Sequence, residues 1–471
     1  MEILHISAEC YPVAKVGGLA DVVGALPKYQ NKAGDIAKVA MPCYKTNFFE
    51  KNNFEIVHEG GVWTGDYWRH FNVFKEKDNK LGFDLYLIDI PGLLDRGKPY
   101  GFYDDQERFT AFQKAVLNWL NSWADLPDVV HCHDHHSGLI PFMMTQCFQY
   151  QRLKEIPTVF TIHNAQYQGW MGWDKFSWIP AFDNWKSGLL DWDNNINSMA
   201  AGVRCAWSVT TVSCGYLEEI KSRANGLENL FQYEAGKCVG IVNGIDPEVW
   251  NPKTDRQIVA NYGLQDVTSG KKANKIALCK QFGLNPRKPL VSFIGRAVPD
   301  KGVDLLPEVI DEVCNETDGA FNFLVLGSGN PDIEWGLKQL RKKYKDCYNV
   351  FVGYNEKLSH QIYAGTDFLL MPSRVEPCGL NQLYSLCYGS IPIVSSVGGL
   401  KDTVVDFGDK GGYGIRFLWV EPWDISRAII RGKELFKNHQ KMYALRKRMM
   451  KIDCSWTKAV KEYSNLYLNL K

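Results

Sequence analysis

The feature that most constrains the fold is a repeated alternation of short, β-branched apolar runs with longer helical patterns. Such runs recur through the first half of the chain, at Ile3–Ser7, Ala37–Met41, Phe83–Ile88, Val129–Cys132, Thr158–Ile162 and Ser208–Val212. Strands that alternate with helices are typical of a parallel sheet covered by helices on both faces. The sequence therefore predicts a doubly wound α/β fold.

The alternation stops and then starts again. A stretch from Asn251 to Pro289 separates the first series of strands from a second, at Leu290–Ile294, Phe323–Leu326, Val350–Val352, Phe368–Met371 and Ile391–Val394. A chain of 471 residues also exceeds what one hydrophobic core usually organises. We therefore predict two Rossmann-like domains joined near residues 247–260, with ligands bound at the carboxyl edges of their sheets.

The overall charge limits the partners. The chain carries 54 basic and 53 acidic residues, so there is no broad positive field to hold nucleic acid. No apolar run reaches the length of a membrane span. We expect a neutral or small anionic substrate, and neither nucleic acid nor a membrane as partner.

The cysteines and the first residues bear on the cellular compartment. The 13 cysteines are odd in number and form no CxxC pair, which indicates reduced thiols. Residues Met1–Ile6 have the pattern of a strand and not of a secretion leader. We therefore expect a cytoplasmic protein.

Two adjacent glycines, Gly17 and Gly18, lie between the first predicted strand and a helix predicted to run to about Lys32. Glycines let backbone amides approach an oxyanion, and Lys15 adds a positive charge. The loop is a candidate phosphate site, although a plain tight turn has the same sequence pattern. A Rossmann dehydrogenase would need GxGxxG here, and the spacing to Gly24 does not provide it, which disfavours hydride transfer.

Two cations follow the first strand of the second series. Arg296 stands at the end of that strand, and Lys301-Gly302 comes shortly after it. Two cations just past a strand can bind a diphosphate and stabilise the charge on a departing nucleotide. Taken singly, such residues are more often surface side chains of a loop.

The strongest motif begins at Glu376, which follows a predicted strand and precedes Pro377-Cys378-Gly379 and a predicted helix. A carboxylate at a strand end can bind sugar hydroxyls, and the amides at a helix start can face an anion. A carboxylate that only caps the helix would also explain Glu376. It would not explain the cations and glycine loops elsewhere in the chain.

In combination, five ordered motifs resemble those of the bacterial glycogen synthases and starch synthases, a family of retaining GT-B glucosyltransferases. The motifs are Lys15-x-Gly-Gly-Leu-Ala-Asp21, Thr161-Ile162-His163-Asn164, Asn243-Gly244-Ile245-Asp246, Arg296 to Lys301-Gly302, and Glu376-Pro-Cys-Gly-Leu. The resemblance implies two Rossmann-like domains facing across a deep cleft. These would comprise residues 1–246 and 247–452, and a last helix, residues 453–471, would return to the first domain.

The resemblance also implies a reaction and a set of site residues. Glucose would pass from ADP-glucose, with UDP-glucose as the rival donor, to the non-reducing end of glycogen or a malto-oligosaccharide, without cofactor or metal. A GT-B enzyme with another acceptor and a non-catalytic glucan-binding homologue are the alternatives. Catalytic roles fall on His163, Arg296, Lys301, Glu376 and Asp134; donor binding on Lys15, Gly18, Asp21, Asn243, Tyr354, Cys378, Gly379, Leu380 and Asn381; and acceptor binding on Tyr167, Trp170 and Trp173.

Three positions and one short segment depart from patterns common among related enzymes. Val16 and Asn381 each stand where threonine is usual in the family, and Ala297–Asp300 replaces a more usual Leu-x-x-Gln. Tyr384 occupies the position of a second glutamate found in many GT-B enzymes, as it does in the glycogen and starch synthases.

Two further clusters leave alternatives open. The run from His131 to His136 suggests a metal site, but successive strand residues point to opposite faces, so we do not expect three of them to converge. The tryptophans from Trp170 to Trp192 form either a wall for a glucan chain or a loop packed on the first domain.

Overall fold

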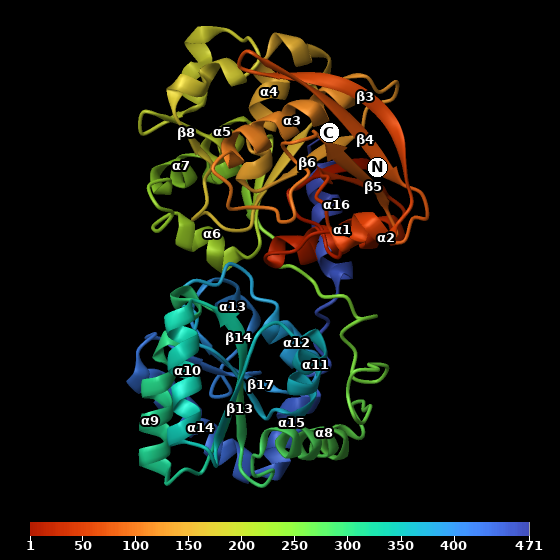
Figure 1. The fold of residues 1–471 in the computed structure, drawn as a ribbon. Helices are drawn as coiled ribbons and strands as arrows, with labels where there is room; N and C mark the ends of the chain where they lie inside the picture. The colour runs from red at the N-terminus through yellow and green to blue at the C-terminus, as the bar shows by residue number, and fades with distance from the viewer. Residues whose placement is uncertain (471) are drawn as a thin grey trace. The chain divides into compact units, whose positions relative to one another are not determined.

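A computed structural model describes residues 1–470 and divides into two compact units (Figure 1). Unit 1 comprises Met1–Asn243 and the chain from Trp456 onward, and unit 2 comprises Gly244–Ser455. The sequence had placed these boundaries at 246/247 and 452/453. Within residues 1–470, no helix is both long enough and apolar enough to cross a bilayer.

Unit 1 is built on a nine-stranded sheet that contains every strand predicted in the first half of the chain. In the order below, the first seven strands pair in parallel. The eighth pairs antiparallel with the seventh, and the ninth pairs antiparallel with the eighth. In spatial order the strands are β12 (Cys238–Gly240), β11 (Ser208–Thr211), β7 (Thr158–Ile162), β6 (Val129–His133), β1 (Glu2–Ile6), β2 (Ile36–Pro42), β5 (Asp84–Asp89), β4 (Tyr67–Glu76) and β3 (Phe54–Thr64).

Sequence patterning missed the β3–β4 hairpin. Its strands pair antiparallel at the edge of the sheet, with Trp63 opposite Trp68, and both of these side chains are exposed. An edge hairpin with one face towards solvent has no continuous apolar run, which is the signal that identified the buried parallel strands. The patterning also missed a small three-stranded sheet, composed of β8 (Trp170–Met171), β10 (Asn195–Asn197) and β9 (Asp191–Trp192).

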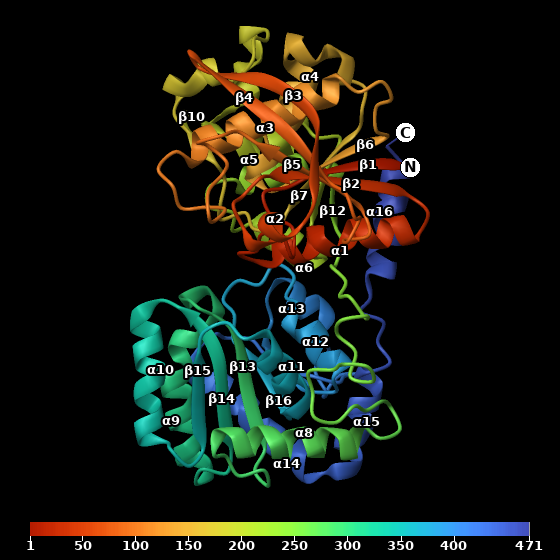
Figure 2. The ribbon, with the colours of Figure 1, turned by 45° about the vertical axis from the view of Figure 1, so that its right-hand side comes forward.

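The C-terminal helix α16 packs against α1 in unit 1, although the two lie at opposite ends of the sequence (Figures 1 and 2). Trp456 and Val460 of α16 share an apolar cluster with Val22 and Leu26 of α1. The α-helices of unit 1 are α1 (Gly18–Lys32), α2 (Asn47–Lys51), α3 (Asp105–Asn121), α4 (Ile140–Gln146), α5 (Ser198–Cys205), α6 (Cys214–Ile220), α7 (Glu228–Tyr233) and α16 (Trp456–Leu468).

Unit 2 contains a six-stranded parallel sheet with the strand order 3-2-1-4-5-6 of a Rossmann fold. Helices cover both faces, as α9 and α11 show on opposite sides in Figures 1 and 2. In spatial order the strands are β15 (Tyr348–Val352), β14 (Asn322–Gly329), β13 (Leu290–Ala297), β16 (Phe368–Met371), β17 (Ile391–Ser395) and β18 (Ile415–Phe417).

Strand β14 shows why the runs of unit 2 are continuously apolar. Phe323 and Val325 belong to one core cluster, whereas Leu324 and Leu326 belong to another on the opposite face. Both faces are buried, so both sets of alternate residues are apolar. The α-helices of unit 2 are α8 (Val267–Phe282), α9 (Leu306–Thr317), α10 (Pro331–Lys343), α11 (Glu356–Gly365), α12 (Asn381–Cys387), α13 (Gly398–Thr403), α14 (Pro422–Lys437) and α15 (His439–Met449).

Candidate active site

The strand order of each unit collects its motifs at one place. In both sheets the order of connection reverses between two neighbouring parallel strands, β1 and β6 in unit 1 and β13 and β16 in unit 2. Ligands of such folds bind beyond the carboxyl ends of these strands. The loops after β1 and β6 carry Lys15 and Asp134, and the loops after β13 and β16 carry Lys301 and Glu376.

Glu9, a residue that the sequence analysis missed, forms hydrogen bonds to the backbone of the glycine loop of unit 1. One Glu9 carboxylate oxygen accepts hydrogen bonds from the backbone amides of Val16 and Gly17, and the other accepts one from the Tyr100 hydroxyl. The pKa of Glu9 is raised, because the effect of burial outweighs these hydrogen bonds, which act to lower it. The only indication of Glu9 in the sequence was that it is a single carboxylate just after the first strand.

The expectation that these amides approach a phosphate is therefore only partly met. The amides of Val16 and Gly17 already donate to Glu9, and the Lys15 ammonium lies 2.6 Å from a carboxylate oxygen of Asp21. A β-carbon placed on Gly17 or Gly18 would meet no atom within 4 Å, so the space above the loop is open. Lys15 remains the predicted donor contact of unit 1.

Gly24 has a different role. A β-carbon there would collide with the Tyr11 carbonyl oxygen. Gly24 thus allows α1 to pack closely against the preceding loop. This close contact explains the glycine at position 24.

Asp134 and His163 lie together at the ends of β6 and β7. One carboxylate oxygen of Asp134 accepts hydrogen bonds from the amides of His163, at 2.7 Å, and Asn164, at 3.4 Å. Burial raises the pKa of Asp134 to about 7 and lowers the pKa of His163 to about 3. At neutral pH His163 is uncharged, and Asp134 holds the backbone that carries it.

The buried histidines of unit 1 predict a loss of stability in acid. Their folded pKa values lie below the unfolded value near 6.5, so the unfolded state binds more protons below that pH. Glu9, Asp89 and Asp134 act in the opposite direction because their pKa values are raised, but they are three groups against seven histidines. The seven histidines with lowered pKa values are the half-buried His58 together with His5, His131, His133, His135, His136 and His163.

We expect the free energy of unfolding of unit 1 to fall by several kcal/mol between pH 6.5 and 5, at about 1.4 kcal/mol per pH unit for each group. Hydrogen-exchange protection of the unit 1 strands at the two pH values measures this loss. Unit 2 contains two of the ten histidines and serves as the internal reference. An equal loss of protection in both units would contradict the expectation.

In unit 2, the structure brings Lys301 and Glu376 together. The Lys301 ammonium lies 2.6 Å from a carboxylate oxygen of Glu376, and the Ser373 hydroxyl donates to the same oxygen at 3.0 Å. Glu376 is buried, Lys301 is half-buried, and Arg296 at the end of β13 is exposed. The pair therefore presents both an acceptor and a cation, and Lys301 lies in the loop that follows Arg296 and β13.

Gly302 allows the two loops of this site to touch. Its φ is +66°, and a β-carbon there would collide with the Pro372 carbonyl oxygen. We expect Gly302→Ala to lower the free energy of unfolding of unit 2 by about 2–5 kcal/mol, measured by chemical denaturation.

Gly283 provides the matched control because it has nearly the same φ, +68°, with no atom within 4 Å of a β-carbon. Gly283→Ala should cost only the left-handed backbone strain, about 1–2 kcal/mol. Equal losses for the two variants would show that the contact with Pro372 has no consequence.

The motif after Glu376 has structural contacts of its own. Gly379 has a φ of +73°, and no side chain caps α12 at Leu380. The Asn381 amide donates to the Ile294 carbonyl oxygen at 2.7 Å, so the side chain found where threonine is usual ties α12 to β13. Cys378 is buried.

Two predicted donor residues lie apart from these clusters. Tyr354, after β15, is exposed, and its hydroxyl donates to Glu356 at 3.2 Å. Asn243, the last residue of the first segment of unit 1, is buried, and no hydrogen-bond partner of its side-chain oxygen is found within residues 1–470.

The predicted acceptor residues differ in exposure. Tyr167 and Trp170 are exposed, whereas Trp173 is half-buried and its indole donates to Asp191 at 3.0 Å. The Trp192 indole donates to the Gly226 carbonyl oxygen at 3.0 Å. The segment from Trp170 to Trp192 thus contains both packed and exposed tryptophans. It is neither wholly a glucan-binding wall nor wholly a loop packed on the first domain.

Two residues of the histidine run meet a histidine of another strand. His131 and His133 point to the same side of β6, as alternate residues must, and they meet His5 of the neighbouring β1. The nitrogen ligand atoms of these three residues lie within 4.8 Å of one another. A pattern within one strand does not indicate His5, because His5 belongs to the neighbouring strand β1.

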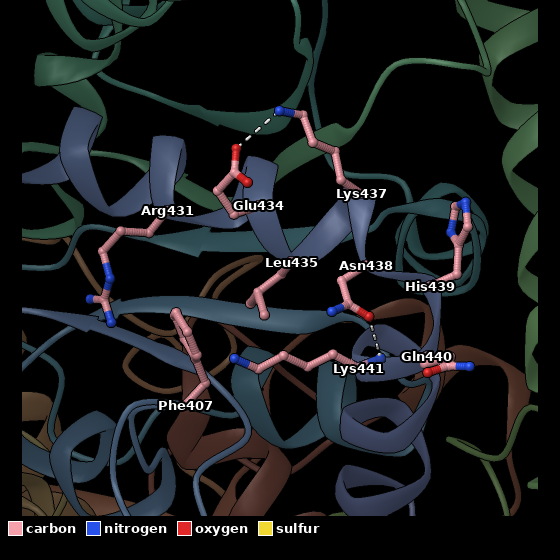
Figure 3. A pocket seen from close by; sticks show the side chains of 9 residues that line it. All are labelled: Phe407, Arg431, Glu434, Leu435, Lys437, Asn438, His439, Gln440 and Lys441. Atoms are coloured by element: carbon pink, nitrogen blue, oxygen red, sulfur yellow. Dashed lines mark hydrogen bonds and ion pairs between the residues drawn. The ribbon is translucent and has the colours of Figure 1, made fainter.

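A pocket of about 660 Å³ lies elsewhere on unit 2, along α14 and α15 (Figure 3). Phe407 lies between the Arg431 guanidinium and the Lys441 ammonium, which are 4.8 and 4.7 Å from its ring centre. Arg431 also pairs with Asp406 at 2.7 Å. None of the predicted site residues lines this pocket, so it gives no support for a donor site there.

Comparison with known proteins agrees with the motifs. A model of the starch synthase catalytic domain matches residues 2–233, and a model of group 1 glycosyl transferases matches residues 274–447. A glycogen synthase of Flavobacterium johnsoniae is 53% identical over 467 residues, 99% of this chain and 98% of its own. A glycogen synthase of Streptococcus uberis is 36% identical over 100% of both chains.

Solved structures agree on the fold. The catalytic domain of starch synthase IV from Arabidopsis thaliana, bound to ADP and acarbose, has a TM-score of 0.89 at 30% identity and covers 100% of this chain and 99% of its own. A sucrose-phosphate synthase from Thermosynechococcus elongatus has a TM-score of 0.64 at 16% identity, covers 99% and 98%, and shares the fold alone. The predicted fold class and family are confirmed: the chain belongs to the glycogen synthase and starch synthase family of GT-B glycosyltransferases.

Proposed function

We propose that the chain transfers glucose from ADP-glucose to the non-reducing end of an α-1,4-glucan with retention of configuration. The observation that carries this proposal is the Lys301–Glu376 pair, which joins the loops after β13 and β16 at the switch point of unit 2. Support also comes from the glycogen synthase relatives and from the starch synthase that binds ADP and acarbose. UDP-glucose is the alternative donor.

Each side chain has a proposed task. Arg296 and Lys301 bind the diphosphate and stabilise its charge as it departs, and Lys15 is the proposed donor contact of unit 1. Glu376 accepts hydrogen bonds from hydroxyls of the donor glucose. These cations are supplied by side chains, so the proposed chemistry requires no metal ion.

We propose that the acceptor 4-hydroxyl attacks the anomeric carbon from the face that the diphosphate leaves. The bond between the anomeric carbon and the diphosphate oxygen breaks, and the hydroxyl proton passes to that departing oxygen. A double displacement would need a carboxylate nucleophile, but Glu376 is paired with Lys301 and Asp134 accepts from two backbone amides. Retention then needs no covalent intermediate. Trapping a glucosyl adduct on the active protein would contradict this route.

The exposed rings of Tyr167 and Trp170 are the proposed contacts for the incoming glucan, since sugar rings stack on aromatic faces. We also propose a cytoplasmic location, because the odd number and spacing of the cysteines fit a reducing compartment.

The test is an assay with glycogen and either ADP-glucose or UDP-glucose, in which released nucleotide and chain lengths are measured, with and without EDTA. We expect ADP release matched by longer α-1,4 chains, unaffected by EDTA. Faster transfer from UDP-glucose would reverse the donor assignment. Glycogen binding without nucleotide release from either donor would identify a glucan-binding protein instead.

A further inference from the structure

A line of buried polar side chains runs through unit 1 from the candidate active site to the C-terminal helix. It joins five residues, His163, His133, His5, Gln30 and Tyr467, which we call the histidine relay. The members come from the end of β7, from β6 and β1, and from helices α1 and α16. All five are buried, so water does not compete for their hydrogen bonds.

The contacts of the relay are continuous. His163 Nε2 lies 3.0 Å from His133 Nδ1, and His133 Nε2 lies 3.0 Å from His5 Nδ1. His5 Nε2 lies 2.7 Å from the side-chain oxygen of Gln30. The Gln30 side-chain nitrogen donates to the Tyr467 hydroxyl at 3.3 Å.

A side branch anchors the far end of the relay. The Tyr467 hydroxyl lies 2.7 Å from His131 Nδ1, and His131 Nε2 lies 2.6 Å from the Thr161 hydroxyl. Tyr467 therefore has a partner on each side, Gln30 and His131, and these two contacts fix the position of its hydroxyl.

A metal ion is the competing explanation for His5, His131 and His133. Each of the six ring nitrogens of these residues already has a hydrogen-bond partner in the relay or its branch. A bound ion would have to break several of these contacts at a site without access to solvent. The existing hydrogen bonds therefore favour the relay over a metal site.

The relay transmits a protonation pattern. Burial lowers the pKa values of His5, His133 and His163, so each ring is neutral at pH 7 and has one N–H and one lone pair. The Gln30 oxygen can only accept, so His5 carries its proton on Nε2 and accepts at Nδ1. His133 must then donate from Nε2 to His5 Nδ1, which leaves His133 Nδ1 as an acceptor. His163 must in turn donate from Nε2 to His133 Nδ1.

We propose that the relay holds His163 in the tautomer protonated on Nε2, with the Nδ1 lone pair left to accept a hydrogen bond from a substrate hydroxyl. Within residues 1–470, no group donates to His163 Nδ1. Gln30 and Tyr467 are then positioning residues that act through two other histidines. The sugar contact rests on the proposed function, whereas the tautomer does not.

The test uses the full chain labelled with ¹⁵N-histidine and long-range ¹H–¹⁵N spectra recorded without donor, with His163 assigned from the His163→Gln variant. In the wild type we expect His163 Nδ1 to be unprotonated. Gln30→Leu removes the acceptor that sets the direction of the relay, and Tyr467→Phe removes the group that holds the Gln30 amide. In both variants His163 should exchange between tautomers, and kcat/KM for the donor should fall about tenfold.

Tyr463→Phe is the matched control. Tyr463 lies on the same helix and its ring contacts His131 and Tyr467, but its hydroxyl is outside the relay as defined. This variant should keep the wild-type tautomer and activity. A His163 that is protonated on Nδ1, or that keeps its tautomer in both relay variants, would overturn the proposal.

Native mass spectrometry with added zinc distinguishes the metal site. We expect no stoichiometric zinc in the wild type. One zinc ion per chain that is lost in His131→Phe would overturn the relay. Because the tautomer is measured without donor, a protein that transfers no glucose but shows the predicted tautomer would refute only the proposed function.

Discussion

Replacing Lys301 by alanine is expected to lower kcat for glucosyl transfer by about 10²–10³-fold, the usual effect of removing one group that stabilises charge in a transition state. Lys301 lies 2.6 Å from Glu376, so its loss removes a cation from the proposed diphosphate site and leaves Glu376 without its ion pair. Initial rates at saturating donor and glycogen measure the effect.

Lys338 on α10 provides the matched control for this variant. It also belongs to unit 2 and forms an ion pair, with Glu334 at 4.0 Å, but it is far more exposed. Lys338→Ala should leave kcat within about twofold of the wild type, because exposed pairs contribute little. A Lys301→Ala enzyme with normal kcat would exclude Lys301 from the chemistry.

Glu376→Gln is expected to lower kcat by a similar factor, about 10²–10³-fold, because the neutral amide neither holds Lys301 nor accepts hydrogen bonds as strongly as a carboxylate. The two residues act as one unit, so the effects should not add. The Lys301→Ala/Glu376→Gln double variant should be about as slow as the slower single variant.

The double-mutant cycle is measured on the same assay, with folding of each variant checked by circular dichroism. If the two single effects multiply in the double variant, Lys301 and Glu376 act independently, and the ion pair has no part in catalysis.

The parallel strands could be predicted because their physical signature is local. Residues such as Leu324 and Val325 are apolar in sequence since both faces of β14 are buried. The β3–β4 hairpin could not be predicted in this way because it lies at a sheet edge with one face towards solvent. Its cross-strand pairs are not encoded in a short window.

The site residues likewise divide into those with a local sequence signature and those without one. Lys15, Lys301 and Glu376 could be singled out because charge next to glycine or proline at a strand end is visible in sequence. The roles of Glu9 and His5 depend partly on contacts with Tyr100 and His133, which are distant in the chain, and a sequence pattern does not show such contacts. Whether Lys15 and Arg296 serve one ligand is a further question, which no local pattern decides.

Titration of ADP into the wild type, Lys15→Ala, Arg296→Ala and the double variant addresses that question directly. Each cation lost from a shared diphosphate should raise the Kd for ADP by about 10–100-fold, the value of one charge-assisted hydrogen bond. We predict such a rise in both single variants. Wild-type affinity in Lys15→Ala, together with weakened binding in Arg296→Ala, would show that the donor site belongs to unit 2 alone.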